Sequence, residues 1–466
     1  MLLPSDFEWQ MEKARKTKTT PEISPFTSRS NSNITINSLL SPTPTPSTSI
    51  TYSEKEEPWR LLDDGHIHHD YFFMDRQDLY TMNDIIERDS YGFKRPTQWV
   101  QIKHLHQFDT YYQPILDKQQ LNWNSMLNQC QGVYPPANIR TNVRKGIPSQ
   151  YRGMAWMHYS GAKSKMEDNP ELYESLVNTA ISMGDHNEFA EIIQRDLHRT
   201  FPDNSKFACG YFTQRDGSIS MEPPETNTKL SALRRILLAF SIHSPQIGYC
   251  QSLNYLAGFF LLFVEKEEEA FWMMVATVHD YMPENMYDVT MEGANIDQAV
   301  LMLLLQERLP KDVWAKINNN ENGSPPITLV TSHWFLTMFI NILPVETVLR
   351  IWDCFFIEGY SVIFQVALTI IHMNKDGISK LHDPIEIFQI LQNMPRRLID
   401  CPTFMDLWSL AYQDGMLDFW QEVKGLLDET IKNVESLLEE RICALKAHKF
   451  QKSKLPSLSS VVKPGY

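Results

Sequence analysis

The stretch ILLAFSIHSPQIGYCQSLNYLAGFFLLFV, residues 236–264, sets the interpretation of the whole chain because it contains no charged side chain. A membrane-spanning helix needs about 20 consecutive apolar residues. Pro245 interrupts this stretch, and the amides Gln251 and Asn254 lie inside it. The stretch therefore predicts two buried helices joined by a short loop at 243–248, with Gln251 at the start of the second helix.

Apolar residues at helical spacing recur along most of the chain, whereas the two-residue alternation typical of strands is nearly absent. Residues 186–197, for example, place Phe189, Ile192, Ile193 and Leu197 on one face. The sequence predicts an all-α protein, with Thr228 as the cap of the helix that leads into the uncharged stretch. Further helices are expected near residues 110–129, 151–156, 170–181, 267–281, 296–309, 331–342, 345–357, 361–373, 384–393, 403–412 and 417–448.

Composition and charge argue against several classes of function. The chain has 466 residues, which is long enough for more than one compact unit. Its net charge of −14 argues against a dedicated nucleic-acid-binding protein. Its six cysteines are scattered without a CxxC pair. Free thiols in a reducing compartment are therefore the simplest interpretation.

The N-terminal region suggests neither a targeting segment nor a metal site. The first residues, MLLPSDFEWQ, are acidic and interrupted, so a signal peptide is not expected. His66, His68 and His69 have a spacing that suits a metal, but no fourth ligand follows at a clear spacing. A solvated surface run is the favoured interpretation. Without a spanning helix, the protein is expected in the cytoplasm or on the periphery of a membrane.

The motifs indicate no self-contained active site, because the chain lacks GxxxxGK[ST], HExxH and GxSxG. Two side chains stand out instead: Arg199, which follows a helix, and Gln251. A guanidinium can neutralise charge on a transferred phosphoryl group, and a carboxamide can orient an attacking water. On spacing alone, Arg199 is more simply a basic residue at a helix C-terminus, within reach of Asp196.

Five segments in order carry a family resemblance. The chain resembles the TBC (Tre2–Bub2–Cdc16) domain GTPase-activating proteins that act on Rab GTPases. The lead-in SYGFKRP (90–96) and the PDN that follows the Arg199 segment resemble the growth-hormone-regulated TBC subgroup in particular. The five segments are RKGIPSQYRGMAW (144–156), IIQRDLHRTFPDN (192–204), GYCQSLNYLAGFFLL (248–262), SHWFLTMF (332–339) and ILPVETVLRIWDCFFIEG (342–359).

The resemblance implies a TBC helical fold in two subdomains and a dual-finger mechanism. It implies that Arg199 is the arginine finger and Gln251 the glutamine finger, both supplied in trans to the GTPase. It also implies that Asp196 steadies Arg199 or its loop, with Tyr249 as a second supporting residue. The positions that it marks as structural are Trp156, Trp352 and Asp353.

The same resemblance implies the partner. A GTP-bound Rab GTPase is expected, so the protein would regulate vesicle trafficking as a GTPase activator rather than as an enzyme with its own active site. No cofactor or metal of its own is expected, because the Rab brings GTP and magnesium. Nucleic acid is not an expected partner, and peripheral association with endomembranes through a partner stays open.

Ser252 departs from the family pattern, which usually has glycine there because glycine permits close backbone approach or unusual dihedrals. The loop is expected to tolerate serine, but a tilt of Gln251 leaves an alternative function: a catalytically weak Rab-binding or scaffolding module. The expected parts of the chain are a disordered Ser/Thr/Pro-rich tail (1–57), an N-terminal helical extension (58–143), the Rab-GAP TBC core (144–359), the C-terminal helices of the TBC fold (360–450) and a flexible tail (451–466).

Overall fold

A computed structural model describes residues 88–130, 139–209, 211–213, 219–221, 223–318, 327–412 and 421–432. Within these residues the regular structure is helical apart from one short hairpin, so the all-α prediction is confirmed. The expected tails at 1–57 and 451–466 and the histidines at 66–69 lie outside the described residues.

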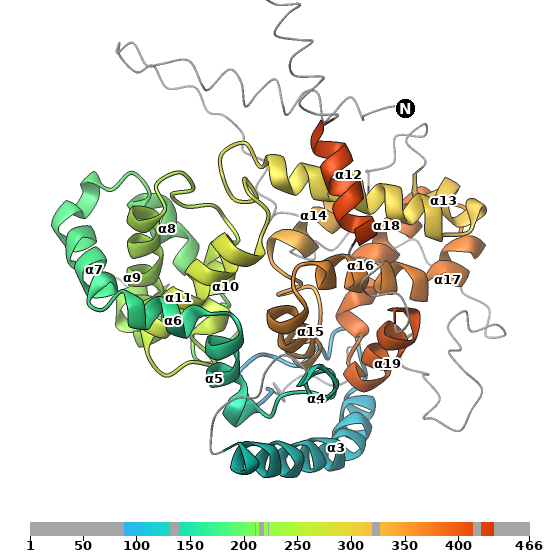
Figure 1. The fold of residues 1–466 in the computed structure, drawn as a ribbon, viewed down its shortest axis with the longest axis horizontal. Coiled ribbons are helices and arrows are strands. Elements are labelled where there is room, and N and C mark those ends of the chain that lie inside the picture. The colour runs from blue at the N-terminus through green and yellow to red at the C-terminus, as the bar shows by residue number, and fades with distance from the viewer. Residues whose placement is uncertain are drawn as a thin grey trace, which may run out of the picture. The chain divides into compact units, whose positions relative to one another are not determined.

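Helices are labelled as in Figure 1. The α-helices are α3 (Ile102–Gln129), α4 (Arg140–Arg144), α5 (Ser149–Tyr159), α6 (Ala162–Asp168), α7 (Leu172–Met183), α8 (Ala190–Leu197), α9 (Thr228–His243), α10 (Leu253–Phe260), α11 (Glu267–Ala276), α12 (Glu292–Arg308), α13 (Lys311–Ile317), α14 (Thr328–Leu336), α15 (Val345–Glu358), α16 (Ser361–Met373), α17 (Lys375–Lys380), α18 (Pro384–Asn393) and α19 (Cys401–Tyr412). Shorter elements are the 3₁₀ turns η4 (Gly184–His186), η5 (Pro224–Thr226) and η7 (Met394–Arg397), the π-helix η6 (Thr277–Tyr281), and the antiparallel strands β1 (Tyr211–Thr213) and β2 (Ile219–Met221).

Most predicted helices are present, but several boundaries differ for identifiable reasons. α3 begins well before residue 110 and continues through Pro114. A proline removes one hydrogen bond from a helix, but burial of Phe108 and Tyr112 against Ile399 offsets that loss. α14 ends at Leu336, not at residue 342, because the chain then turns through residues with positive φ. Of the long helix expected at 417–448, only 421–432 is described.

The cap of α9 was assigned to the wrong residue. Asn227, not Thr228, precedes the helix, and its side-chain oxygen accepts hydrogen bonds from the backbone nitrogens of Lys229 and Leu230 at 2.9 and 3.1 Å. Asparagine caps a helix at least as well as threonine. The helix therefore begins where it was predicted, with the capping oxygen supplied one residue earlier.

Two groups of helices build the core. In the first, α9 packs against α7, α8, α10 and α11, and in the second, α16 packs against α12, α14, α15 and α19. α5 contacts α11 of the first group and α15 of the second, so it joins the two groups (Figure 1). It also contacts α6, which packs on α11. These groups correspond to the two subdomains expected from the sequence. Among the described helices, none combines the length and the hydrophobicity that crossing a membrane requires.

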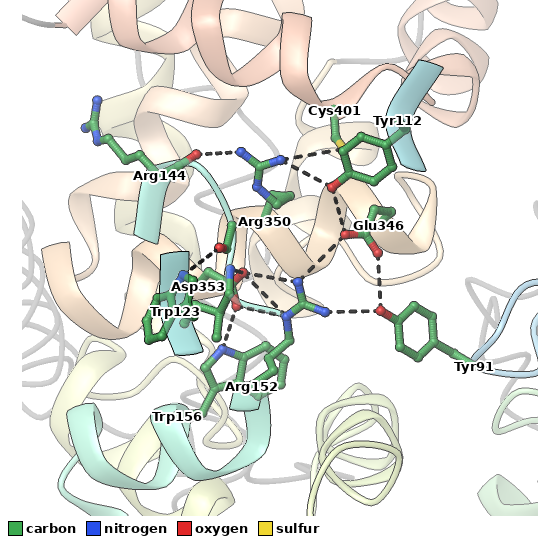
Figure 2. Close-up of polar contacts among 12 residues, drawn as sticks. Tyr91, Tyr112, Trp123, Arg144, Arg152, Trp156, Glu346, Arg350, Asp353 and Cys401 are labelled. Carbon is green, nitrogen blue, oxygen red and sulfur yellow. Dashed lines mark hydrogen bonds and ion pairs between the residues drawn. The ribbon is translucent and has the colours of Figure 1, made fainter. Parts of the chain in front are cut away.

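A buried ion pair fixes α5 against α15 (Figure 2). The Arg152 Nε donates to Asp353 Oδ1 at 3.0 Å, and both side chains are buried. Asp353 also accepts from Trp156 Nε1 at 2.9 Å and from the backbone nitrogen of Ile147 at 3.0 Å. Because each carboxylate oxygen has donors, the pair meets the condition under which a buried charge is tolerated. The expected structural roles of Trp156 and Asp353 are thereby explained.

The segment before α3 is bound to the same network. The Tyr91 hydroxyl accepts from Arg152 Nη1 at 3.1 Å and donates to Glu346 Oε2 at 3.3 Å (Figure 2). Two residues later, the Phe93 ring meets Phe201 edge to face, with centroids 5.1 Å apart. The segment at 89–96 therefore forms a turn anchored by aromatic rings, and it packs against the chain that follows α8.

Candidate functional site

The end of α8 carries Arg199 into a tight turn. Ile193 and Leu197 bury one face of this helix, which ends at Leu197. Phe201 then adopts φ +50° with its ring buried. A non-glycine residue at positive φ needs support from its surroundings. Here the ring packs against Phe93 from the N-terminal segment. Arg199 stays partly exposed at the rim, with 28% of its side chain accessible.

Asp196 links Arg199 to the uncharged stretch. Arg199 Nη2 forms an ion pair with Asp196 Oδ1, and the Tyr249 hydroxyl donates to Asp196 Oδ2. Burial raises the pKa of the Asp196 carboxyl, while the bonds from Tyr249 and Arg199 oppose that rise. Arg199, Asp196 and Tyr249 thus form one hydrogen-bonded unit, and the contact between Asp196 and Arg199 that their spacing predicted is present.

The Arg199 guanidinium keeps unused donor capacity. Its Nε is buried and has no hydrogen-bond partner within the described residues. A guanidinium has five N–H donors. Asp196 therefore holds one side of the group and leaves other donors for a ligand at the rim.

The segment that carries Gln251 reaches Asp196 through Tyr249. Gly248 has φ +61°, and a Cβ atom there would lie 2.1 Å from the Phe189 ring, so only glycine fits. Tyr249 follows as a buried anchor; burial and the neighbouring Asp196 raise the pKa of its hydroxyl, which therefore remains a donor. Gln251 is partly exposed, and its side chain forms no hydrogen bond within the described part of the chain.

Three residues to which the sequence analysis assigned no role in the site hold the two segments together. Asn254 Nδ2 donates to Thr200 Oγ1 at 2.8 Å, and the Thr200 hydroxyl donates to the Asp196 carbonyl at 2.7 Å. The Tyr255 hydroxyl donates to the Arg199 carbonyl at 3.5 Å. An amide inside a fully buried apolar helix was the available signal for Asn254, because such a group needs a partner.

Ser252 occupies a backbone conformation that favours glycine. Its φ is +105° and its ψ is −32°, and it is buried at the N-terminus of α10. Its backbone nitrogen donates to Asn254 Oδ1 at 3.2 Å, and its carbonyl accepts from Tyr255 at 3.0 Å. A conformation of this kind costs about 1–3 kcal/mol in a residue with a side chain. The departure from the family pattern therefore falls at a strained position directly after Gln251.

The described residues contain no group of three or more His, Cys, Asp and Glu side chains arranged to hold a metal ion. Asp196 is bound to Arg199, and Cys250 is a free, partly buried thiol. The chemistry available at this rim is therefore that of a guanidinium and a carboxamide held on two joined segments.

Comparisons with known proteins show the family of this chain. The family model described as the Rab-GTPase-TBC domain matches residues 149–379. Growth hormone-regulated TBC protein 1 of Homo sapiens is 36% identical over 320 residues, which cover 68% of this chain and 88% of that protein. The GTPase-activating protein GYP3 of Saccharomyces cerevisiae is 32% identical over 380 residues, which cover 67% of this chain and 58% of that protein.

A solved structure shares the fold. The Chlamydomonas flagellar RabGAP TBC domain superposes with a TM-score of 0.55 at 23% sequence identity. The superposition covers 70% of this chain and 99% of that domain. At this level of identity the likeness concerns the fold, and it agrees with the helical architecture described above.

Proposed function

This chain belongs to the Rab-GTPase-TBC domain family, and on that premise we propose that it accelerates GTP hydrolysis by a Rab GTPase through Arg199 and Gln251. The observation that carries the proposal is that hydrogen bonds join the two segments that contain these residues. One segment carries Arg199 and the other carries Gln251, and both side chains are partly exposed. GTP and magnesium would be supplied by the GTPase, so this chain would need neither.

Arg199 would act on charge that develops on the transferred phosphoryl group. A guanidinium placed there in trans is worth about 10³–10⁵ in rate. The ion pair with Asp196 limits the rotamers of Arg199 before the partner arrives, so less side-chain entropy is lost on docking. Tyr249 donates to the second carboxylate oxygen and keeps Asp196 from turning away. Asp196 and Tyr249 are positioning residues in this scheme.

Gln251 would orient the attacking water. A carboxamide offers an acceptor for one proton of the water and a donor for a second group. Its side chain is not committed to a hydrogen bond within the described residues, so both functions are available. The backbone beneath it is fixed on one side by Gly248 and Tyr249 and on the other by Asn254. A rigid base of this kind keeps the amide within reach of a docked nucleotide.

The test is a hydrolysis screen of the full chain against a panel of purified, GTP-loaded Rab GTPases. We expect Arg199→Ala to reduce stimulated hydrolysis by at least about 10³-fold, and Gln251→Ala to reduce it strongly as well. Arg195→Ala is the matched control, because this arginine lies on α8 four residues before Arg199, is 68% exposed and makes only a long ion pair of 4.0 Å with Glu191. Stimulation by Arg199→Ala equal to that of the unmodified chain would contradict the mechanism.

The strain at Ser252 favours a second candidate function, a Rab-binding or scaffolding module with weak catalysis. If serine tilts the Gln251 backbone, binding would persist while stimulation is lost. Ser252→Gly separates the two, because a large gain in stimulated hydrolysis would support the scaffold and little change would support the activator. In either case we propose a cytoplasmic location, with any membrane association coming through a partner.

A further inference from the structure

A closed turn precedes α3 and packs against the turn that carries Arg199. This lead-in turn comprises residues 88–94, and an antiparallel backbone bridge joins its two ends. Asp89 Oδ1 accepts from the backbone nitrogens of Tyr91 and Phe93, both at 2.9 Å. Aspartate commonly closes turns in this way. The conformation of the lead-in turn is therefore set by its own hydrogen bonds.

Tyr91 anchors the lead-in turn to the helices behind it. Its hydroxyl accepts from Arg152 Nη1 at 3.1 Å and donates to Glu346 Oε2 at 3.3 Å, so it reaches both α5 and α15 (Figure 2). Its ring also lies against Phe263, with centroids 5.1 Å apart. Because Arg152 belongs to the buried ion pair between α5 and α15, the lead-in turn is attached to the contact that joins the two groups of helices.

Hydrogen bonds also join the lead-in turn to the Arg199 turn, which comprises residues 198–205. The Ser205 backbone nitrogen donates to the Gly92 carbonyl at 2.9 Å, and Asn204 Nδ2 donates to the Tyr91 carbonyl at 3.3 Å. Gly92 has φ +95°, and a Cβ atom there would lie 2.6 Å from Ser205 Oγ and 2.8 Å from Asn204 Oδ1. Glycine at this position therefore permits the two turns to approach each other closely.

The Phe93 ring supports an unfavourable backbone conformation in the Arg199 turn. Phe201 has φ +50°, and a residue with a side chain keeps such a conformation only where its surroundings hold it. Among the described rings, the neighbours of Phe201 are Phe93 at 5.1 Å, Phe207 at 5.5 Å and Tyr255 at 5.7 Å between centroids. Phe93 is the nearest of these three rings, and it reaches Phe201 from the lead-in turn.

The position of Arg199 depends on how its turn is held. α8 ends at Leu197, so Arg199 lies in the turn and not in the helix. From the α10 side, Asn254 Nδ2 donates to Thr200 Oγ1 at 2.8 Å, and from the opposite side the lead-in turn holds Phe201. Loss of the Phe93 ring would remove support from the second side only. The long side chain of Arg199 would carry a small shift of its backbone to the guanidinium.

We propose that Phe93 is a positioning residue for Arg199: its ring holds Phe201, and with it the Arg199 turn, in the conformation from which the guanidinium meets the transferred phosphoryl group. This inference rests on the proposed function, because it takes Arg199 as the group that acts on the GTP of a docked Rab. Phe93 is assigned no contact with the nucleotide or with the Rab. Its loss would therefore lower kcat and leave the affinity for the Rab unchanged.

The test uses the full chain and the GTP-loaded Rab of the panel that it stimulates most. We expect Phe93→Ala to lower kcat by about 10- to 100-fold, because a misplacement of about 1 Å costs about 10²-fold. KM should stay within about twofold, because binding of the Rab does not depend on the position of the guanidinium. Phe93→Leu keeps apolar volume against Phe201 and should retain kcat within about threefold.

Asp89 offers a second route to the same effect, because it closes the lead-in turn and its substitution leaves both rings in place. Asp89→Ala removes the acceptor for the backbone nitrogens of Tyr91 and Phe93 and should lower kcat by about tenfold. Asp89→Asn keeps a side-chain oxygen and should retain kcat within about twofold. Burial raises the pKa of the Asp89 carboxyl to about 6, so the site tolerates a neutral side chain.

Phe388→Ala is the matched control. Phe388 is partly buried on α18 and packs against the core, and α18 contacts α13 and η7. The substitution removes the same ring and should also lower the free energy of unfolding. It should leave kcat and KM unchanged when all the variants are assayed below their melting temperatures.

Two measurements ask whether Phe93 acts through the Arg199 turn. In single-turnover assays with the activator in excess, Phe93→Ala should cause no further loss in a chain that already carries Arg199→Ala, because residues that act together are not additive. Hydrogen exchange of the backbone amides of residues 198–205 should be faster in Phe93→Ala than in the unmodified chain, and Phe388→Ala should not change it.

The outcomes separate this inference from the proposed function. Unchanged kcat in Phe93→Ala, an equal loss in Phe388→Ala, or a further loss in the Arg199→Ala background would each overturn the positioning role, and Arg199→Ala alone would still test the activator. If the unmodified chain stimulated no Rab, the activator would be overturned. Hydrogen exchange would then decide the support of the turn, because unchanged exchange at 198–205 in Phe93→Ala would overturn it and faster exchange would keep it.

Discussion

Replacement of Ser252 by glycine should stabilise the folded chain, although Ser→Gly substitutions usually destabilise proteins. The backbone at φ +105° costs about 1–3 kcal/mol in a residue with a side chain, and glycine removes that cost. The added freedom of glycine in the unfolded chain offsets about 0.4–1 kcal/mol. The Ser252 hydroxyl makes no hydrogen bond within the described residues, so nothing else is lost. We expect a net gain of about 1 kcal/mol.

The assay is urea unfolding followed by circular dichroism, with Ser175→Gly as the control. Ser175 lies exposed within α7, where glycine should lower the free energy of unfolding by about 0.5 kcal/mol. Ser252→Ala keeps the Cβ atom and should change stability little. If Ser252→Gly destabilised the chain as much as Ser175→Gly does, the strain assigned to residue 252 would be wrong.

Two further predictions concern stability. Asp353→Ala should lower the free energy of unfolding by about 3–5 kcal/mol in urea unfolding, because the buried Arg152 loses its shortest ion pair and keeps only the longer pair with Glu346 and the bond to Tyr91. Glu167→Ala, which breaks the exposed pair with Lys163, should cost under about 0.5 kcal/mol, and equal losses would refute the difference. Burial and then Arg396 lower the pKa of His333 to about 4, so between pH 6.5 and 4 the unfolded state binds more protons than the folded state. The free energy of unfolding therefore decreases as the pH is lowered, by about 2 kcal/mol from this residue at pH 5. His333→Gln should remove that part of the pH dependence, and an unchanged slope would contradict the assignment.

Local patterns were sufficient to predict much of the fold. Uncharged residues on both sides of Pro245 predicted α9 and α10, and helical spacing predicted α8 and the approach of Asp196 to Arg199. In α3 a long-range contact outweighed a local preference, and after α14 the backbone turns in a way that spacing does not show. Pro114 is tolerated inside α3 because its neighbours are buried against a distant segment. α14 ends early because a run of positive φ follows it.

The site was only partly predictable from local sequence. The motifs identified Arg199 and Gln251, but spacing could not show that Thr200 and Asn254 bind each other, because they belong to segments far apart in the sequence. Nor could it show that the conformation of Ser252 is the one that glycine prefers.

The packing of Phe93 behind Phe201 has a consequence for where the functional unit begins. The family model matches residues 149–379, and that interval contains every side chain assigned here to phosphate chemistry. Yet the turn that carries Arg199 is covered by a ring from outside that interval, and the backbone nitrogen of Ser205 donates to the Gly92 carbonyl at 2.9 Å. A fragment cut at the border of the shared domain would keep Arg199 and Gln251 but would lose the ring that packs on one side of Phe201, whose other neighbours are Phe207 and Tyr255. The interval that the family model matches is therefore shorter than the set of residues that support the Arg199 turn, because that set extends back to Gly92 and Phe93.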